Sequence, residues 1–166
     1  MKRFLKIALV VVLCIASLFP MKSFAIDGEK VQWYNIDFPE SEIQRILGLN
    51  PQDEASTRAS DLIVSYNVGI AKDGSTIKLV AKMVCDGDVV KCGFKKILIQ
   101  KRATTSSSWS TCLTLEDLYY NGYAHSIGRI ISVPYGYQYR AVCTFYAKKS
   151  LLVTQKIELA SNIVTI

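Results

Sequence analysis

From residue 61 onward, apolar and polar residues alternate, and this alternation restricts the fold more than any other feature. Between Ile77 and Cys85 every second residue is apolar, while Lys78 and Lys82 lie between them. A period of two places one set of side chains on a single face of a β-strand. The pattern therefore predicts a strand with one face buried in a core.

Further runs with strand character follow, separated by residues typical of tight turns. The turn signals are Lys72–Ser75, Asp86–Asp88 and Pro134–Gly136. The expected strands are 62–70, 77–85, 94–102, 109–115, 127–133, 137–146 and 156–166. About seven short strands predict one all-β domain over 61–166, an antiparallel sandwich or barrel. Only Leu113–Tyr120 leaves a single turn of helix open as an alternative.

The first 25 residues have the three parts of a cleavable signal peptide. Basic residues precede an apolar run from Ile7 to Phe19, and a small-x-small pattern ends at Ala25. The run is shorter than the roughly 20 residues of a membrane-spanning helix. We therefore expect cleavage after Ala25, a mature chain that begins near Ile26, and a secreted protein that meets the membrane only during export.

Removal of the leader changes the charge of the protein. The whole chain has 20 basic and 14 acidic residues. Four basic residues lie in the leader, so 16 remain against 14 acidic residues, a net charge of +2. A charge this small gives no general attraction to nucleic acid or to anionic lipid. We therefore expect no nucleic-acid partner.

Residues 26–60 differ in character from the domain that follows. They contain Pro39 and Pro51 and only one short stretch with a helical pattern. In that stretch Ser41 is a candidate N-cap and Gly48 a candidate stop, with apolar residues between them on one face. So short a helix is marginal without packing partners. We expect 26–60 to form a mobile or loosely docked arm.

Several short motifs resemble known families. The segment Gly136–Val142 is similar to the penultimate strand of fibronectin type III and related immunoglobulin-like domains. The chain from about residue 57 also resembles a family of small secreted proteins of Gram-positive anaerobes with no assigned activity. The segments that carry this second resemblance are Arg58–Ser60, Cys92–Ile97, Tyr139–Cys143, Tyr146–Lys148 and Ala160–Val164. Together the resemblances imply an immunoglobulin/fibronectin-III-like β-sandwich and an export route.

Four cysteines remain after the leader: Cys85, Cys92, Cys112 and Cys143. An even number in an exported chain predicts two disulfides. Cys85 and Cys143 share the inward phase of their strands, which favours a Cys85–Cys143 bridge with Cys92–Cys112. The alternative is Cys85–Cys92 with Cys112–Cys143. The spacing does not match a zinc site, so we expect no metal.

The sequence contains no recognisable catalytic or cofactor motif. His125, the sole histidine, is a candidate general base in an expected loop. The acidic pairs Asp86/Asp88 and Glu116/Asp117 lack the further oxygen ligands that a calcium loop needs. We therefore expect no catalytic residues and no cofactor.

Aromatic residues in or beside loops are the best candidates for recognition, because exposed tyrosine offers rigid amphipathic contact area. These candidates are Tyr119, Tyr120, Tyr123 and Tyr135. Tyr139 and Trp109 are expected to fill the core. The function expected is that of a secreted, non-catalytic binding or structural protein whose partner is a protein or glycan outside the cell. The alternatives are a small secreted hydrolase or hydrolase inhibitor, and a factor released by trimming of the arm.

Overall fold

The structure, a computed structural model, describes residues 31–48 and 62–166. The predicted signal peptide, its cleavage site at Ala25 and the Arg58–Ser60 motif lie outside the described residues.

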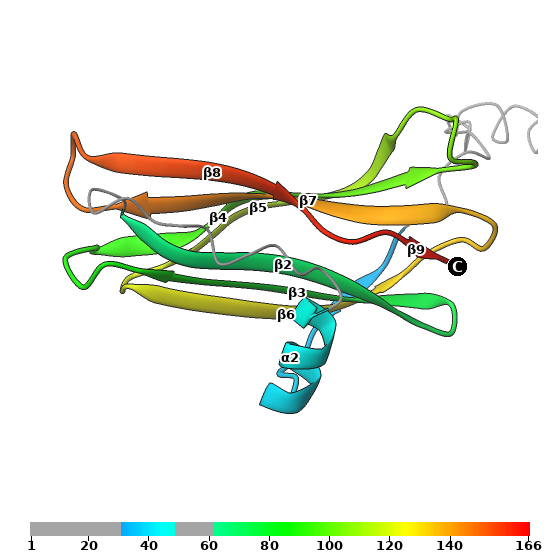
Figure 1. Cartoon of the computed structure of the whole chain (residues 1–166), viewed down its shortest axis with the longest axis horizontal. Helices are drawn as coiled ribbons and strands as arrows, with labels where there is room; N and C mark the ends of the chain where they lie inside the picture. Colours follow the sequence, from blue (N-terminus) through cyan, green and yellow to red (C-terminus); the bar gives the residue numbers. More distant parts are fainter. Residues whose placement is uncertain (1–30, 49–61) are drawn as a thin grey trace, which may run out of the picture.

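Two antiparallel β-sheets pack face to face (Figure 1). The elements in chain order are β1 (Trp33–Asn35), α2 (Glu40–Gly48), β2 (Ile63–Asp73), β3 (Thr76–Cys85), β4 (Lys91–Arg102), β5 (Ser110–Tyr120), β6 (Ala124–Ser132), β7 (Gln138–Lys148), β8 (Thr154–Ala160) and β9 (Val164–Thr165). One sheet has the order β1-β6-β3-β2, and the other has the order β5-β4-β7-β8 with β9 paired to β7. The predicted all-β sandwich is confirmed. The expected strand 156–166 is divided into β8 and β9, and the short strand β1 was not expected.

The core lies between the sheets and is lined by the inward side chains of each strand. Along β7 every second residue from Tyr139 to Ala147 is buried. The Phe145 ring meets Phe94 with centroids 5.6 Å apart and Tyr66 with centroids 5.2 Å apart. Burying this much aromatic surface is a main contribution to stability in a domain of this size.

Strand β3 follows the predicted alternation, because the residues from Ile77 to Cys85 that were expected inward are all buried. Val80, on the opposite face, is buried as well, in a second cluster beneath α2. The segment Leu113–Tyr120 is strand throughout, so the alternative of a helical turn is wrong there. Its backbone pairs with β4 from Leu113↔Ile99 to Tyr120↔Cys92.

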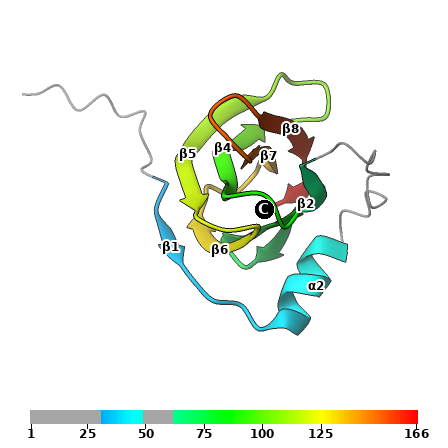
Figure 2. The same cartoon turned by 90° about the vertical axis from the view of Figure 1, so that its left-hand side faces the viewer.

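Residues 31–48 are docked on the sandwich and do not form a loose arm (Figure 2). Strand β1 pairs with β6, and α2 buries Ile46 and Leu47 against the outer face of β2 and β3. Two glycines make this approach possible. A Cβ at Gly69 would meet the Ile46 carbonyl, and one at Gly128 would meet the Ile36 carbonyl.

The predicted helix exists but begins one residue before the proposed cap. Ser41 lies inside α2, and the Pro39 carbonyl accepts hydrogen bonds from Glu42 N at 2.9 Å and from Ile43 N at 3.1 Å. Proline is tolerated at the start of a helix because its missing N–H has no helical acceptor there.

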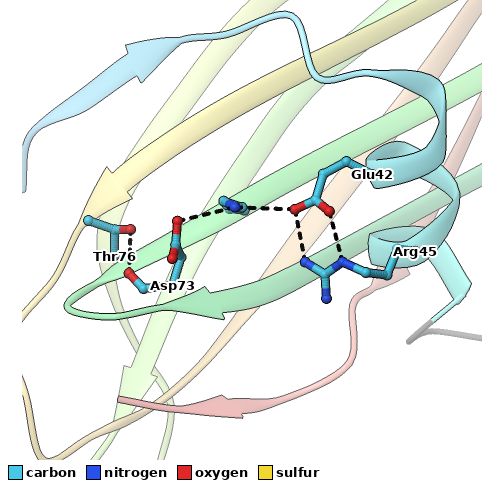
Figure 3. A network of polar contacts seen from close by, with 5 residues as sticks. Glu42, Arg45, Asp73 and Thr76 are labelled. Carbon is cyan, nitrogen blue, oxygen red and sulfur yellow. Dashed lines mark hydrogen bonds and ion pairs between the residues drawn. The ribbon is translucent and has the colours of Figure 1, made fainter.

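Ionic contacts also tie α2 to the β2–β3 hairpin (Figure 3). Glu42 accepts two hydrogen bonds from Arg45, at 2.8 and 2.9 Å, and pairs with Lys78 at 3.2 Å. Lys78 also contacts Asp73 at 3.1 Å, and Thr76 donates to the Asp73 carbonyl. The hydrogen bond from Arg45 lowers the pKa of Glu42 to about 2, with a smaller contribution from Lys78.

Side-chain amides cover the outer edge of β2. Asn162 accepts from Ile70 N at 3.0 Å and donates to Ile70 O at 2.8 Å, as a neighbouring strand would. The Gln155 side chain accepts from Ile63 N at 2.9 Å. Gln155 belongs to β8 and Asn162 to the connection between β8 and β9, so the two amides join the layers along an edge that strand pairing leaves open.

The chain returns to the core at Ile166. Its side chain is buried, its N–H donates to Tyr137 O at 3.1 Å and its carbonyl accepts from Gly136 N at 2.8 Å. This closes the end of the sandwich that carries the β6–β7 turn.

Candidate functional site

Three connections meet at one end of the sandwich, on the left in Figure 1 and toward the viewer in Figure 2. The strand register brings them together, because Lys91 is paired with Lys148, Cys92 with Tyr120, and Val84 with Ala124. We call this surface the loop end. It consists of residues 86–90, 120–123 and 149–153, together with Val64 at the start of β2.

The loop end carries most of the large apolar side chains that are exposed among the described residues. Leu151 and Leu152 are 88% and 95% exposed, the two highest values in that group. The others at this end are Val64, Val90, Tyr120, Tyr123 and Val153. Single exposed apolar residues are ordinary, but a group on adjacent loops makes this end of the sandwich a candidate interaction surface.

The tip that holds the two leucines is anchored at its base. Lys149 N and Ser150 N donate to Val153 O at 3.0 and 3.4 Å, so the turn closes on itself and projects Leu151 and Leu152 outward. The neighbouring loop is tied to it by Val90 N, which donates to Lys148 O at 3.0 Å.

Positive charge surrounds this tip. Lys148 and Lys149 precede it, Lys156 follows it on β8, and Lys91 lies on the paired strand β4. Two acidic residues, Asp86 and Asp88, lie in the adjacent loop. Lys149 contacts Asp88 at 2.6 Å and lowers the pKa of that carboxyl. Lysine is therefore in excess around the apolar tip.

The structure places two of the four tyrosines predicted for binding, Tyr120 and Tyr123, as exposed residues at the loop end. Tyr119 precedes Tyr120 on β5 and points to the opposite face of the strand, where it packs against Tyr146 with Lys91 Nζ 4.2 Å from its ring centroid. Burial raises the pKa of Tyr119, and nearby Asp117 raises it further. Tyr135 lies in the turn before β7, at the opposite end of the sandwich.

His125 is held between aromatic rings. Its ring stacks on Tyr120 with centroids 5.5 Å apart, and lies 5.3 Å from Phe94. Burial lowers the pKa of His125, and the charge of Arg129 lowers it further. Among residues 31–48 and 62–166, no hydrogen bond or ion pair joins His125 to a carboxylate or hydroxyl, so the geometry assembles no base–orienter pair around it.

The four cysteines are free thiols in this structure. The favoured Cys92–Cys112 bridge is incompatible with the register, because Cys92 is opposite Tyr120, eight residues along β5 from Cys112. At about 3.3 Å per residue the two are roughly 26 Å apart, whereas a disulfide needs Cα atoms about 4.4–6.8 Å apart.

The strand register also decides which of the other cysteine pairs could form a disulfide. Cys143 is opposite Ile97 and Cys92 is opposite Ala147, so Cys143 lies four residues, about 13 Å, further along the sandwich than Cys92. Cys85 and Cys92 lie near each other at the loop end, where each thiol shifts the pKa of the other. Cys112 is on β5, which β4 separates from the β7 strand of Cys143. Of the pairs that were considered, Cys85 and Cys92 are thus the one that the fold brings together.

The two residues expected in the core have different environments. Tyr139 is fully buried, and its hydroxyl donates to Pro134 O at 2.7 Å. Trp109 is only partly buried, and lies between the guanidinium groups of Arg102 and Arg140, each 4.4 Å from its ring. Trp109 is therefore a cation–π partner near the surface.

Sequence analysis missed the residues that protrude furthest, Leu151 and Leu152. The signal that could have found them is local. Two leucines stand in the segment 149–153, directly after two lysines, where a connection between strands would ordinarily carry polar turn residues.

The fold and this surface together define the class: an antiparallel β-sandwich with an apolar, lysine-rimmed loop end. Comparison with protein-family models, curated proteins and solved structures finds no match to the chain. Within 31–48 and 62–166, no helix has the length and apolar character to cross a bilayer.

Proposed function

We propose that this protein is an exported, non-catalytic binding protein that engages its partner through the loop end. The observation that carries the proposal is the pair Leu151 and Leu152, almost fully exposed on an anchored tip beside exposed Tyr120 and Tyr123. Keeping such a group in water is unfavourable, since each large apolar side chain gains about 1.5–3 kcal/mol on burial.

We also infer that the sandwich is of the immunoglobulin-like type. Taking β2 as the first strand, the orders β2-β3-β6 and β4-β7-β8 follow the A-B-E and C-F-G arrangement of that class. The hydrogen bond from Tyr139 to Pro134 has the form of a tyrosine corner. The sequence departs from antibody domains in having no tryptophan on β4.

Two features of the exported form belong to the same proposal. The mature chain begins near Ile26, which the leader pattern supports. In an oxidising compartment Cys85 and Cys92 form a disulfide, which the proximity of their thiols at the loop end supports.

Cosedimentation with envelope fragments of the cells that export the protein tests the proposal. The double variant Leu151→Ser/Leu152→Ser should lose most of the binding. Tyr135→Ser is the matched control, because it removes an exposed apolar side chain at the opposite end and should bind as the unaltered protein does. Equal binding by all three proteins would contradict a role for the loop end.

A further inference from the structure

We propose that the partner of the loop end is the surface of an anionic lipid bilayer, into which Leu151 and Leu152 insert. This rests on the proposed function and names the partner of that same site. The small net charge of the mature chain predicted no general attraction to anionic lipid. That charge is a sum over the whole molecule and does not show that several lysines lie around one tip.

The shape of the tip favours a fluid apolar medium over a preformed protein surface. Leu151 and Leu152 protrude from the apex of a turn that is closed by hydrogen bonds to Val153 O. A protein partner would need a pocket matched to this projection, whereas lipid chains rearrange around any apolar tip. Val90 and Val153 extend the apolar surface just behind it.

Amphipathic rings lie close to the tip. Tyr120 and Tyr123 are exposed on the 120–123 connection at the same end. Tyrosine is enriched at membrane–water interfaces, where the ring contacts the acyl boundary and the hydroxyl stays hydrated. The arrangement of aliphatic tip and tyrosine rings thus matches the layers of a bilayer surface.

Charge complementarity identifies the kind of lipid. Lys149 is neutralised by Asp88, which leaves Lys91, Lys148 and Lys156 around the tip against Asp86 in the adjacent loop, a local net charge of +2. Lysines beside an inserted apolar group attract anionic headgroups and are screened by salt. Two leucines form a small insert, so we expect weak, reversible attachment that needs both the apolar tip and the charge.

Flotation with lipid vesicles tests this inference on the purified, full-length mature protein. It should float with vesicles of equal phosphatidylglycerol and phosphatidylcholine and remain behind with phosphatidylcholine alone. Leu151→Ser/Leu152→Ser should lower the bound fraction about tenfold or more, and Tyr135→Ser should not. Because both leucines are exposed, unfolding temperatures of the variant and the parent should agree.

A second readout tests insertion itself. In Leu152→Trp, the emission of the new tryptophan should move to shorter wavelength when anionic vesicles are added. In Tyr135→Trp, the emission of the new tryptophan should not move. Equal flotation of the serine variant and the parent would overturn the inference, as would no flotation. If vesicles fail but envelope binding still depends on Leu151 and Leu152, the partner is a protein or glycan and the proposed function stands.

Discussion

The hydroxyl of Tyr139 is a polar group inside an aromatic core, and it donates to the Pro134 carbonyl at 2.7 Å. Tyr139→Phe would retain the ring packing and leave that carbonyl without its donor. We expect the free energy of unfolding in urea to fall by about 1–3 kcal/mol. Tyr137→Phe is the control, because Tyr137 is only partly buried, and should change stability much less.

The environment of His125 predicts a dependence of stability on pH. Its pKa is lowered in the folded protein, so the unfolded chain binds the proton more readily. The stabilisation is therefore complete above the unfolded pKa of about 6.5 and is lost as the pH falls through the lower folded value.

Urea unfolding between about pH 8 and pH 5 measures this. The slope should shrink in His125→Phe, which retains the stacking on Tyr120. Glu42 contributes in a separate, more acidic window, because its pKa is lowered to about 2 and it loses stabilising charge only below about pH 4.5. An unchanged slope above pH 5 in the variant would show that His125 titrates as it does in the unfolded chain.

The burial of a side chain could be predicted from the sequence where it depends on the alternation within a single strand. The inward phase of Tyr139 is visible in the alternation of residues 137–146, and its burial is confirmed. Trp109 was placed wrongly because its neighbours Arg102 and Arg140 come from β4 and β7. The register between strands determines which side chains meet across a sheet. The residue pattern of a single strand does not reveal that register.

At the scale of elements, the edge of β2 shows how the sandwich limits further strand pairing. We expect Asn162→Ala to leave Ile70 N and O without their amide partner and to lower the free energy of unfolding by about 1–3 kcal/mol. The variant should also self-associate more at high concentration, because an uncovered strand edge can pair with another chain.

Light scattering and urea unfolding on the same samples measure both effects. Asn121→Ala is the matched control, since it changes an exposed asparagine in the 120–123 connection and should alter neither. A variant at position 162 that is destabilised but does not associate would show that the edge is protected by other means.

The strands and α2 were predictable from periodicity, but the docking of 31–48 was not. Segment 31–48 approaches this closely because Gly69 admits the backbone of α2 at Ile46 and Gly128 admits the backbone at Ile36. In the sequence these glycines look like weak points inside strands. Their role, which is to leave room for the backbone of segment 31–48, is recognisable only in the folded structure.

At the scale of the whole molecule, Cys85 ends a strand of one sheet and Cys92 begins a strand of the other. A bridge between them would join the layers and stabilise the fold by about 2 kcal/mol in the chain-entropy model for a short loop. Burial raises the pKa of the Cys85 thiol to about 12, so we expect slow oxidation that an oxidising compartment must drive.

Peptide mapping of the protein from the medium, denatured and alkylated before any reduction, should find Cys85 joined to Cys92 and label on Cys112 and Cys143. The intact mass should correspond to a chain that begins at Ile26. A peptide that joins Cys112 to any other cysteine would contradict the strand register described above.

The loop end could not be predicted from local sequence patterns, because it is assembled by strand pairing. Residues 86–90, 120–123 and 149–153 lie far apart in the chain, and only the pairing of β4 with β5 and β7 assembles them. Tyr120 and Tyr123 were found because aromatic residues in a loop are conspicuous. Leu151 and Leu152 resemble core residues until the hairpin is seen to end there.

The buried position of Ile166 has a consequence for the timing of folding. Strands β8 and β9 and Ile166 all follow β7 in the chain, and each completes part of the wall or end of the core. Because β7 precedes these segments, its outer edge and one end of the core stay uncovered until residues 154–166 are in place. The core is therefore completed by the part of the domain that is synthesised last.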